Sequence, residues 1–122
     1  DEKKAEAKIN RWNAIAESAA KQSKRSIVPK VLKPQTVENA LETVKDYGVK
    51  LLPYENAQGI KKTRSILESL DTKNNIAVFI GPEVERIKNS GFEVITLGKR
   101  ILRTETAGLA LLSNIMIRLE EE

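Results

Sequence analysis

Cysteine and histidine are both absent from the 122-residue chain. Their absence excludes disulfide bonds, zinc sites built on Cys or His, a cysteine nucleophile and a histidine general base. Neither the glycine-rich dinucleotide fingerprint nor a phosphate-binding P-loop occurs in the sequence. Any catalysis must therefore rest on Arg, Lys, Asp, Glu, Ser, Thr or Tyr side chains and on backbone groups.

Long apolar runs are also absent, and none approaches the roughly 20 residues that a membrane-spanning helix needs. Hydrophobic residues make up 40% and charged residues 31% of the chain, as in a globular protein long enough to bury one core. The opening stretch DEKKAEAK is charged, unlike a signal peptide, and a chain free of cysteine is compatible with the cytoplasm. Because it opens without Met, we expect a piece of a longer protein.

The excess of positive charge lies near the N-terminus. The chain has a formal net charge of +4, but residues 1–35 hold nine Lys or Arg against four Asp or Glu, a net of +5. A basic third of the chain suggests a polyanionic partner such as RNA. An ordinary solvated helix face explains the same charges equally well, so both interpretations stay open.

The pattern of apolar residues predicts an alternation of helices and strands. In the first helix, Ala5, Ile9, Trp12, Ala16 and Ala19 form one apolar stripe. The run at 76–80 is continuously apolar, which is typical of a strand covered on both faces, and Thr36 is a plausible N-cap. We expect helices at 3–22, 37–47, 59–70, 84–90 and 106–119, and strands at 49–54, 76–80 and 93–97.

This alternation favours an α/β fold, with a mostly parallel sheet flanked by helices, within one domain. In such sheets, ligands bind at the carboxyl ends of the strands. The three strands end in LLPYEN, FIGPE and TLGKRILRTET, and all three ends carry Gly, Pro or Glu. We expect these loops to converge on one site.

Four segments resemble the RsmE family of ribosomal RNA uridine methyltransferases, members of the SPOUT superfamily. They are RWNAIAESAAKQSKRSIVP (11–29), LPYEN (52–56), FIGPE (79–83) and GFEVITLGKRILRTETAGLALLSNIM (91–116), the last being the most specific. The resemblance implies a SPOUT-type fold with a C-terminal trefoil knot, a rare exception among protein topologies. It also implies binding of S-adenosylmethionine, methylation of N3 of a uridine in 16S rRNA on the small ribosomal subunit, and a cytoplasmic homodimer.

The resemblance and the chemistry of methyl transfer together suggest roles for individual residues. Transfer from a sulfonium needs alignment more than acid–base groups, which suits a site without His or Cys. Apolar side chains would enclose adenine, and glycines would let the backbone approach it. The expected cofactor contacts are Leu52, Ile80, Gly81, Pro82, Glu83, Leu97, Gly98, Ile101, Leu102, Thr106 and Ala107. The expected RNA contacts are Arg11, Gln22, Arg25, Lys99 and Arg100, and no metal is expected.

Arg103 and Glu105 are the candidate catalytic residues. A guanidinium can stabilise the anion formed when uridine N3 loses its proton, or it can hold the substrate phosphate. The structural alternative is an ion pair between Arg103 and Glu105. Glu105 also suits the start of the last helix because of the helix dipole, and Thr104 is a reasonable N-cap there.

Two departures from the family pattern bear on activity. The family has a glycine-rich turn after Gly-Pro-Glu, whereas Glu83 here continues directly into Val84, so that roughly seven residues are missing. Either that segment was too mobile to be recorded, which we favour because lids at ligand sites lose order first, or it is deleted and activity is in doubt. The PUA-like N-terminal domain, which grips RNA in the family, is also absent from residues 1–122.

The last helix is apolar on nearly every side, from Ala107 to Leu119. One stripe facing a core does not explain this, so we expect a dimer interface.

Two other classes of function compete with the enzyme. One is a non-catalytic RNA-binding module that keeps the fold, and the other is a structural α/β domain without a ligand.

Overall fold

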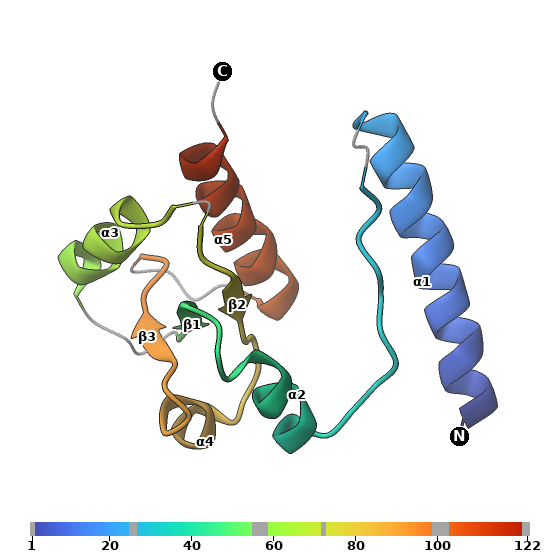
Figure 1. Ribbon diagram of the computed structural model, residues 1–122, viewed down its shortest axis with the longest axis horizontal. Coiled ribbons are helices and arrows are strands. Elements are labelled where there is room, and N and C mark those ends of the chain that lie inside the picture. Colours follow the sequence, from blue (N-terminus) through green and yellow to red (C-terminus); the bar gives the residue numbers. More distant parts are fainter. Residues whose placement is uncertain (1, 25–26, 55–58, 72, 99–102, 121–122) are drawn as a thin grey trace. The chain divides into compact units, whose positions relative to one another are not determined.

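The computed structural model describes residues 2–24, 27–54, 59–71, 73–98 and 103–120. The expected residues Arg25, Lys99, Arg100, Ile101 and Leu102 lie outside these ranges. The chain divides into two compact units, Asp1–Ala40 and Leu41–Glu122 (Figure 1). None of the helices in the described ranges is both long enough and apolar enough to span a membrane.

The first unit consists mainly of the long helix α1 (Glu2–Gln22) and an extended segment that runs back along it (Figure 1). Asn13, in the middle of α1, ties the two together. Its Nδ2 donates to the carbonyl oxygen of Val31 (2.9 Å), and its Oδ1 accepts from the Val31 N–H (2.7 Å). Because one amide satisfies both backbone groups of Val31, it fixes the segment in place much as a neighbouring strand would.

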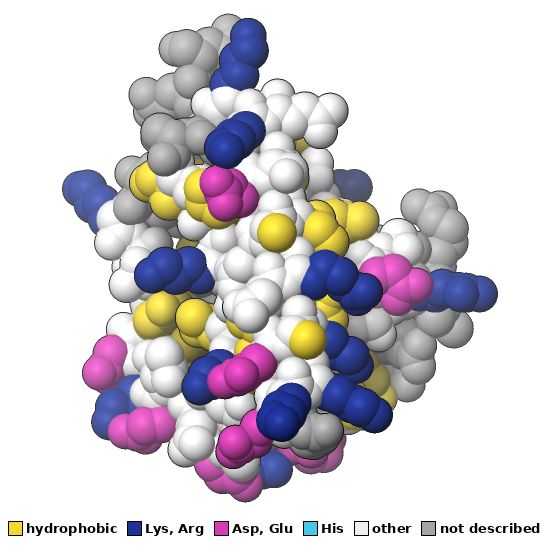
Figure 2. Space-filling view, turned by 90° about the vertical axis from the view of Figure 1, so that its right-hand side faces the viewer, with side chains coloured by type: hydrophobic (Ala, Val, Ile, Leu, Met, Phe, Trp, Pro, Cys, Tyr) yellow, Lys and Arg dark blue, Asp and Glu magenta, His cyan; other side chains and the backbone are white. Residues whose placement is uncertain are grey.

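The face of α1 that is least exposed differs from the predicted apolar stripe. It contains Ala5, Ile9, Asn13, Ala16 and Ala20, whereas Trp12 is 39% exposed. Trp12 and Ala19 of the predicted stripe are exposed in the single chain, and the hydrogen bonds of Asn13 turn a polar residue inward in their place. In the view of Figure 2, Lys and Arg side chains are exposed with Asp and Glu side chains among them.

Helix α2 (Val37–Val44) begins as the sequence predicts. The Asn39 N–H donates to Thr36 Oγ1 (3.2 Å), and the Ala40 N–H donates to the Thr36 carbonyl oxygen (3.0 Å). Thr36 is therefore confirmed as the N-cap, because its side chain satisfies one of the N–H groups that lack a partner inside the helix.

A parallel three-stranded sheet organises the second unit and confirms the predicted α/β class. Strand β1 (Val49–Pro53) lies in the centre, between β2 (Ile76–Val78) and β3 (Glu93–Ile95). Leu51 pairs with Val78 on one side and with Glu93 on the other. The helices of this unit are α3 (Ile60–Glu68), α4 (Val84–Lys88) and α5 (Thr104–Leu119).

The core forms on one face of β1, between the sheet and helices α3 and α5. Leu51 and Ile95 from the sheet pack with Leu67 from α3 and with Leu111 and Ile115 from α5. Leu52 is 0% exposed but lies outside this cluster. Since successive side chains of a strand face opposite ways, Leu52 belongs to the other face of β1, a strand against which α4 packs.

The expectation that the run 76–80 is covered on both faces is wrong. Strand β2 forms an edge of the sheet, and Val78 is 39% exposed. Within the described residues β2 pairs with β1 alone, and the exposure of Val78 shows that one face of the strand is not covered in the single chain.

Helix α5 starts two residues earlier than predicted. Its N-cap is Arg103, whose backbone is extended, and the Ala107 N–H donates to the Arg103 carbonyl oxygen (2.8 Å). Thr104 is therefore the first helical residue, and its prediction as the N-cap was wrong. The first turn of α5 consequently lies beside the ends of the strands.

Candidate active site

A cavity of about 390 Å³ opens at the carboxyl ends of the three strands. This is within the range of about 300–1,000 Å³ that is usual for small-molecule sites. Each strand contributes the residues that follow it, and α4 and α5 contribute their first turns. The lining residues are Pro53, Tyr54, Ile80, Gly81, Pro82, Val84, Leu97, Gly98, Thr104 and Ala107.

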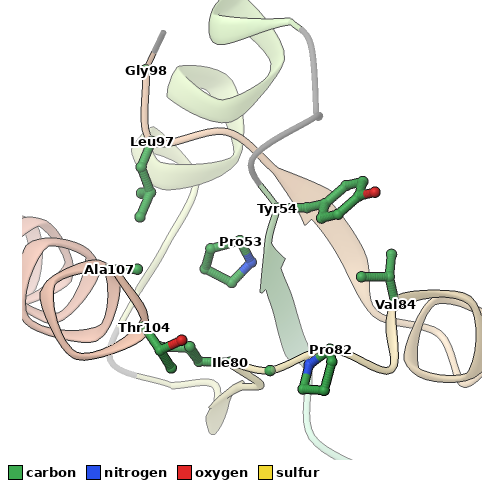
Figure 3. A pocket seen from close by; sticks show the side chains of 10 residues that line it. Pro53, Tyr54, Ile80, Pro82, Val84, Leu97, Gly98, Thr104 and Ala107 are labelled. Atoms are coloured by element: carbon green, nitrogen blue, oxygen red, sulfur yellow. The ribbon is translucent and has the colours of Figure 1, made fainter. Parts of the chain in front are cut away.

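The side chains that line the cavity are mainly apolar, and polar groups come from the backbone and from the hydroxyls of Tyr54 and Thr104. In Figure 3, Leu97, Ala107, Thr104 and Ile80 lie on one side of Pro53. Tyr54 and Val84 lie on the other side. Such walls suit a flat heterocycle, and the Thr104 hydroxyl and the backbone groups offer the hydrogen bonds that would orient it.

Helix α5 packs closely against Ile80, which follows β2, at a glycine. A Cβ added at Gly108 would lie 3.1 Å from Cδ1 of Ile80, the far end of a flexible side chain. Ile80 lines the cavity, so a larger residue at 108 would shift the Ile80 side chain in this wall.

Six residues predicted to contact the cofactor line this cavity together: Ile80, Gly81, Pro82, Leu97, Gly98 and Ala107. Three others do not line it: Leu52, Glu83 and Thr106. Leu52 is buried within β1, and Thr106 is exposed on the first turn of α5. The sequence reasoning missed four lining residues, namely Pro53, Tyr54, Val84 and Thr104. The position of Pro53 and Tyr54 at the carboxyl end of a predicted strand was the signal that could have found them.

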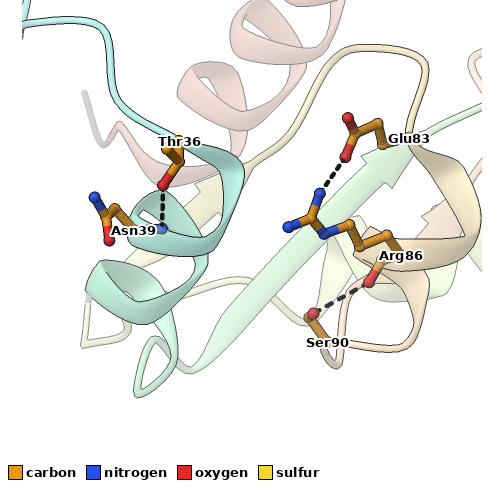
Figure 4. A network of polar contacts seen from close by, with 5 residues as sticks. All are labelled: Thr36, Asn39, Glu83, Arg86 and Ser90. Carbon is orange, nitrogen blue, oxygen red and sulfur yellow. Dashed lines mark hydrogen bonds and ion pairs between the residues drawn. The ribbon is translucent and has the colours of Figure 1, made fainter.

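A second, more open hollow adjoins the first and shares Tyr54, Pro82 and Val84 with it. It also contains Glu83, so this predicted cofactor contact lies next to the main cavity. Nη1 of Arg86 lies 3.0 Å from Oε2 of Glu83, and the Ser90 hydroxyl donates to the Arg86 carbonyl oxygen (Figure 4). Glu83 leads directly into α4, where the Ile87 N–H donates to its carbonyl oxygen (3.1 Å).

Arg103 and Glu105 lie next to the cavity, because they precede and follow the lining residue Thr104 in the chain. Both side chains are exposed. Arg103 makes no side-chain capping hydrogen bond, and no ion pair joins it to Glu105 among the described residues. The two charged groups therefore do not form an ion pair with each other, and both remain accessible to a ligand.

The expected RNA contacts that the structure describes are both on α1. Arg11 and Gln22 are exposed, and Gln22 is the last residue of that helix. Within the described ranges, no three acidic side chains gather closely enough to hold a metal ion. The site is therefore built from apolar walls, backbone groups and the charged residues next to it.

Comparison with known proteins identifies relatives of the whole chain. It is 36% identical to the ribosomal RNA small subunit methyltransferase E of Mesomycoplasma hyopneumoniae (strain 232), covering 88% of this chain and 48% of the relative. Identity to the protein of the same name from Bacillus subtilis (strain 168) is 37%, covering 98% and 51%. The chain thus spans about half the length of these curated relatives. They confirm the resemblance to the RsmE family.

A solved structure shares the fold described above. The crystal structure of a ribosomal RNA small subunit methyltransferase E from Neisseria gonorrhoeae, bound to S-adenosyl methionine, matches with a TM-score of 0.74 and 29% identity. The match covers 95% of this chain and 50% of that one. A family model described as an RNA methyltransferase domain matches residues 1–116. This chain therefore belongs to the RNA methyltransferase domain family.

Proposed function

We propose that this chain is the methyltransferase domain of an S-adenosylmethionine-dependent enzyme that methylates N3 of a uridine in 16S rRNA. One observation carries the proposal. Six of the residues expected to contact the cofactor, drawn from two strand ends and one helix, line a single cavity of about 390 Å³. The relatives named as rRNA methyltransferases and the related structure with bound S-adenosyl methionine support the same function.

The residues present fit this cofactor. Leu97, Ile80 and Ala107 form apolar walls that would hold adenine, and the Thr104 hydroxyl can donate to or accept from a polar atom of the ligand. When bound, S-adenosylmethionine supplies a methyl group activated by its sulfonium sulfur. The task of the protein is then to align that group with the acceptor and to exclude water.

Arg103 and Glu105 are proposed to act on the acceptor. The Arg103 guanidinium stabilises the negative charge that develops on the uracil ring as N3 loses its proton. Glu105, two residues further along α5, offers a carboxylate that can hydrogen-bond to N3–H and accept this proton. Their exposure next to the cavity leaves both groups open to a nucleotide approaching from solvent.

Calorimetry with S-adenosylmethionine is the experiment that tests the function. We expect binding in the micromolar range, because six of the residues expected to contact the cofactor line one cavity. A protein that fails to bind the cofactor but retains RNA affinity would instead be a non-catalytic RNA-binding module. Absence of both activities would leave a structural domain.

The proposal includes the SPOUT-type topology with its C-terminal knot, a location in the cytoplasm with the ribosome, and a homodimer.

We expect sedimentation to show a dimer at tens of micromolar protein. The side of α5 away from the core exposes Leu109 (70%), Leu112 (53%) and Ile117 (75%), which is costly for a monomer. A Leu109→Glu and Leu112→Glu double variant should sediment as a monomer. A wild-type monomer at that concentration would contradict the proposed dimer.

RNA binding by residues 1–122 is expected to be weak and strongly dependent on salt. The net charge of +5 on residues 1–35 provides nonspecific attraction, and each phosphate contact releases counterions. Filter binding of a 16S rRNA fragment should therefore lose affinity steeply between low and physiological salt. Arg11→Ala should reduce the slope, since Arg11 is exposed on α1. A complex that is insensitive to salt would rule out this electrostatic mode.

A further inference from the structure

Two buried polar side chains connect helix α3 to a wall of the cavity. Among the described residues, the buried polar side chains are Thr63 (4% exposed) on α3 and Thr96 (5%) directly after β3. The Thr96 N–H donates to Thr63 Oγ1 (3.0 Å) across 33 residues of sequence. A buried N–H is costly to leave without an acceptor, and the sheet provides none for this one because β3 ends at Ile95.

The hydroxyl of Thr96 in turn holds both backbone groups of Gly98. It donates to the Gly98 carbonyl oxygen (3.0 Å) and accepts from the Gly98 N–H (3.2 Å). Gly98 has a φ of +113°, a conformation that residues with a Cβ rarely adopt. One hydroxyl thus closes a tight turn, and Leu97 and Gly98 in that turn line the cavity.

We propose that Thr63 and Thr96 are positioning residues that set the Leu97–Gly98 wall of the cofactor cavity from helix α3. This inference rests on the proposed function for its consequence, but its structural part stands without it. Thr63 is well placed to serve as the fixed end of the chain of contacts that runs through Thr96 to Gly98. Its N–H donates to the Gly59 carbonyl oxygen (3.1 Å), and Leu67, one turn further along α3, packs in the main core.

The chain of contacts acts through orientation. When Thr63 accepts the Thr96 N–H, it fixes the peptide that carries the Thr96 side chain, and that side chain fixes Gly98. Without the first hydrogen bond, the turn samples other conformations and the wall that faces adenine is formed only part of the time. The apparent affinity for the cofactor is then proportional to the fraction of molecules in which the wall is formed.

The alternative is that Thr63 only fills space between α3 and β3. Valine has nearly the same shape as threonine but lacks the hydroxyl, and serine keeps the hydroxyl but lacks the methyl group. If packing were the whole role, Thr63→Val would be harmless and Thr63→Ser harmful. If the hydrogen bond matters, the order is reversed.

Hydrogen exchange of the Gly98 amide, measured by NMR on residues 1–122 without cofactor, tests the structural part. We expect Thr63→Val to speed this exchange about tenfold relative to the Leu51 amide, the scale of one buried hydrogen bond. Thr63→Ser should stay near wild type. Ser65→Ala, which removes an exposed hydroxyl from the same helix, is the matched control and should change nothing. Taking Leu51 as reference removes any change in global stability.

Calorimetry with S-adenosylmethionine tests the consequence. Thr63→Val should weaken binding about tenfold and Thr96→Val at least as much, while the double variant should bind about as weakly as Thr96→Val, because both act through Gly98. Unchanged Gly98 exchange in Thr63→Val would overturn the inference, and so would additive losses of affinity. If the wild type binds no S-adenosylmethionine, the proposed function fails, and the exchange data still decide whether Thr63 positions the turn.

Discussion

Replacing Arg103 with alanine is expected to slow methyl transfer to 16S rRNA by about 10²-fold or more, the scale on which a lost transition-state donor is felt. Stability and cofactor affinity should stay close to wild type. Arg103 is the N-cap of α5, but its side chain makes no capping hydrogen bond, and the Ala107 N–H bonds to its backbone carbonyl, which alanine retains. Arg103→Lys should restore little, because a point charge does not replace a planar guanidinium.

The methyl-transfer assay should include the rest of the length of the curated relatives, since this chain covers only about half of them. We suggest a chimera in which residues 1–122 replace the matching half of the Bacillus subtilis protein. Arg118→Ala, at the opposite end of α5, is the matched control and should leave turnover unchanged, because Arg118 lies in the last turn, far along the helix from the cavity. Normal turnover in a well-folded Arg103→Ala chimera would remove Arg103 from the mechanism.

The order of helices and strands could be predicted from the sequence because each element carries a local signal. Thr36 caps α2 as predicted, through a contact with Asn39 only three residues away. The β1 and β3 predictions start at the observed residues, Val49 and Glu93. Loops after parallel strands meet at one edge of a sheet, so the position of the site also followed from the order of elements.

Contacts between distant residues could not be predicted in this way. Thr63 looks like an ordinary residue of an amphipathic helix, and its hydrogen bond to Thr96 crosses 33 residues of sequence. Leu52 was expected to contact the cofactor because it belongs to LPYEN, one of the segments that carry the family resemblance. It is buried, and the alternation of side chains along β1 places its side chain on the opposite face of the strand from Leu51. Asn13 was not singled out at all, since nothing in the sequence marks its pairing with Val31.

The exposed apolar residues show a second limit of the sequence. Val78 and Leu112 have the hydrophobicity of core residues, yet they are exposed in the single chain. Periodicity reports that a residue is suited to burial, but it does not report which molecule covers it. In the proposed dimer a partner chain would bury the outer side of α5, so the covering of these residues is part of the proposed function and not of the described fold.

A larger side chain at position 107, which would fill part of the cavity, is expected to weaken cofactor binding strongly without unfolding the protein. In Figure 3 the Cβ of Ala107 faces the cavity from the first turn of α5. Leucine at this position adds three carbon atoms to a space of about 390 Å³, so it occupies empty volume instead of overpacking the core. Ala107→Leu should keep or slightly raise the melting temperature, since it buries apolar surface.

The added side chain occupies the space proposed for adenine, so the loss of affinity for S-adenosylmethionine should be on the order of 10²-fold, or about 2.7 kcal/mol. The matched control is Ser113→Leu, which places the same side chain on the exposed surface of the same helix and should leave affinity unchanged. Calorimetry gives the affinity, and thermal unfolding shows that both variants are folded. A folded Ala107→Leu protein that binds as tightly as wild type would move the cofactor out of this cavity. The methyltransferase proposal would then lose the observation that carries it, because the other residues at the strand ends would line a space that the ligand does not use.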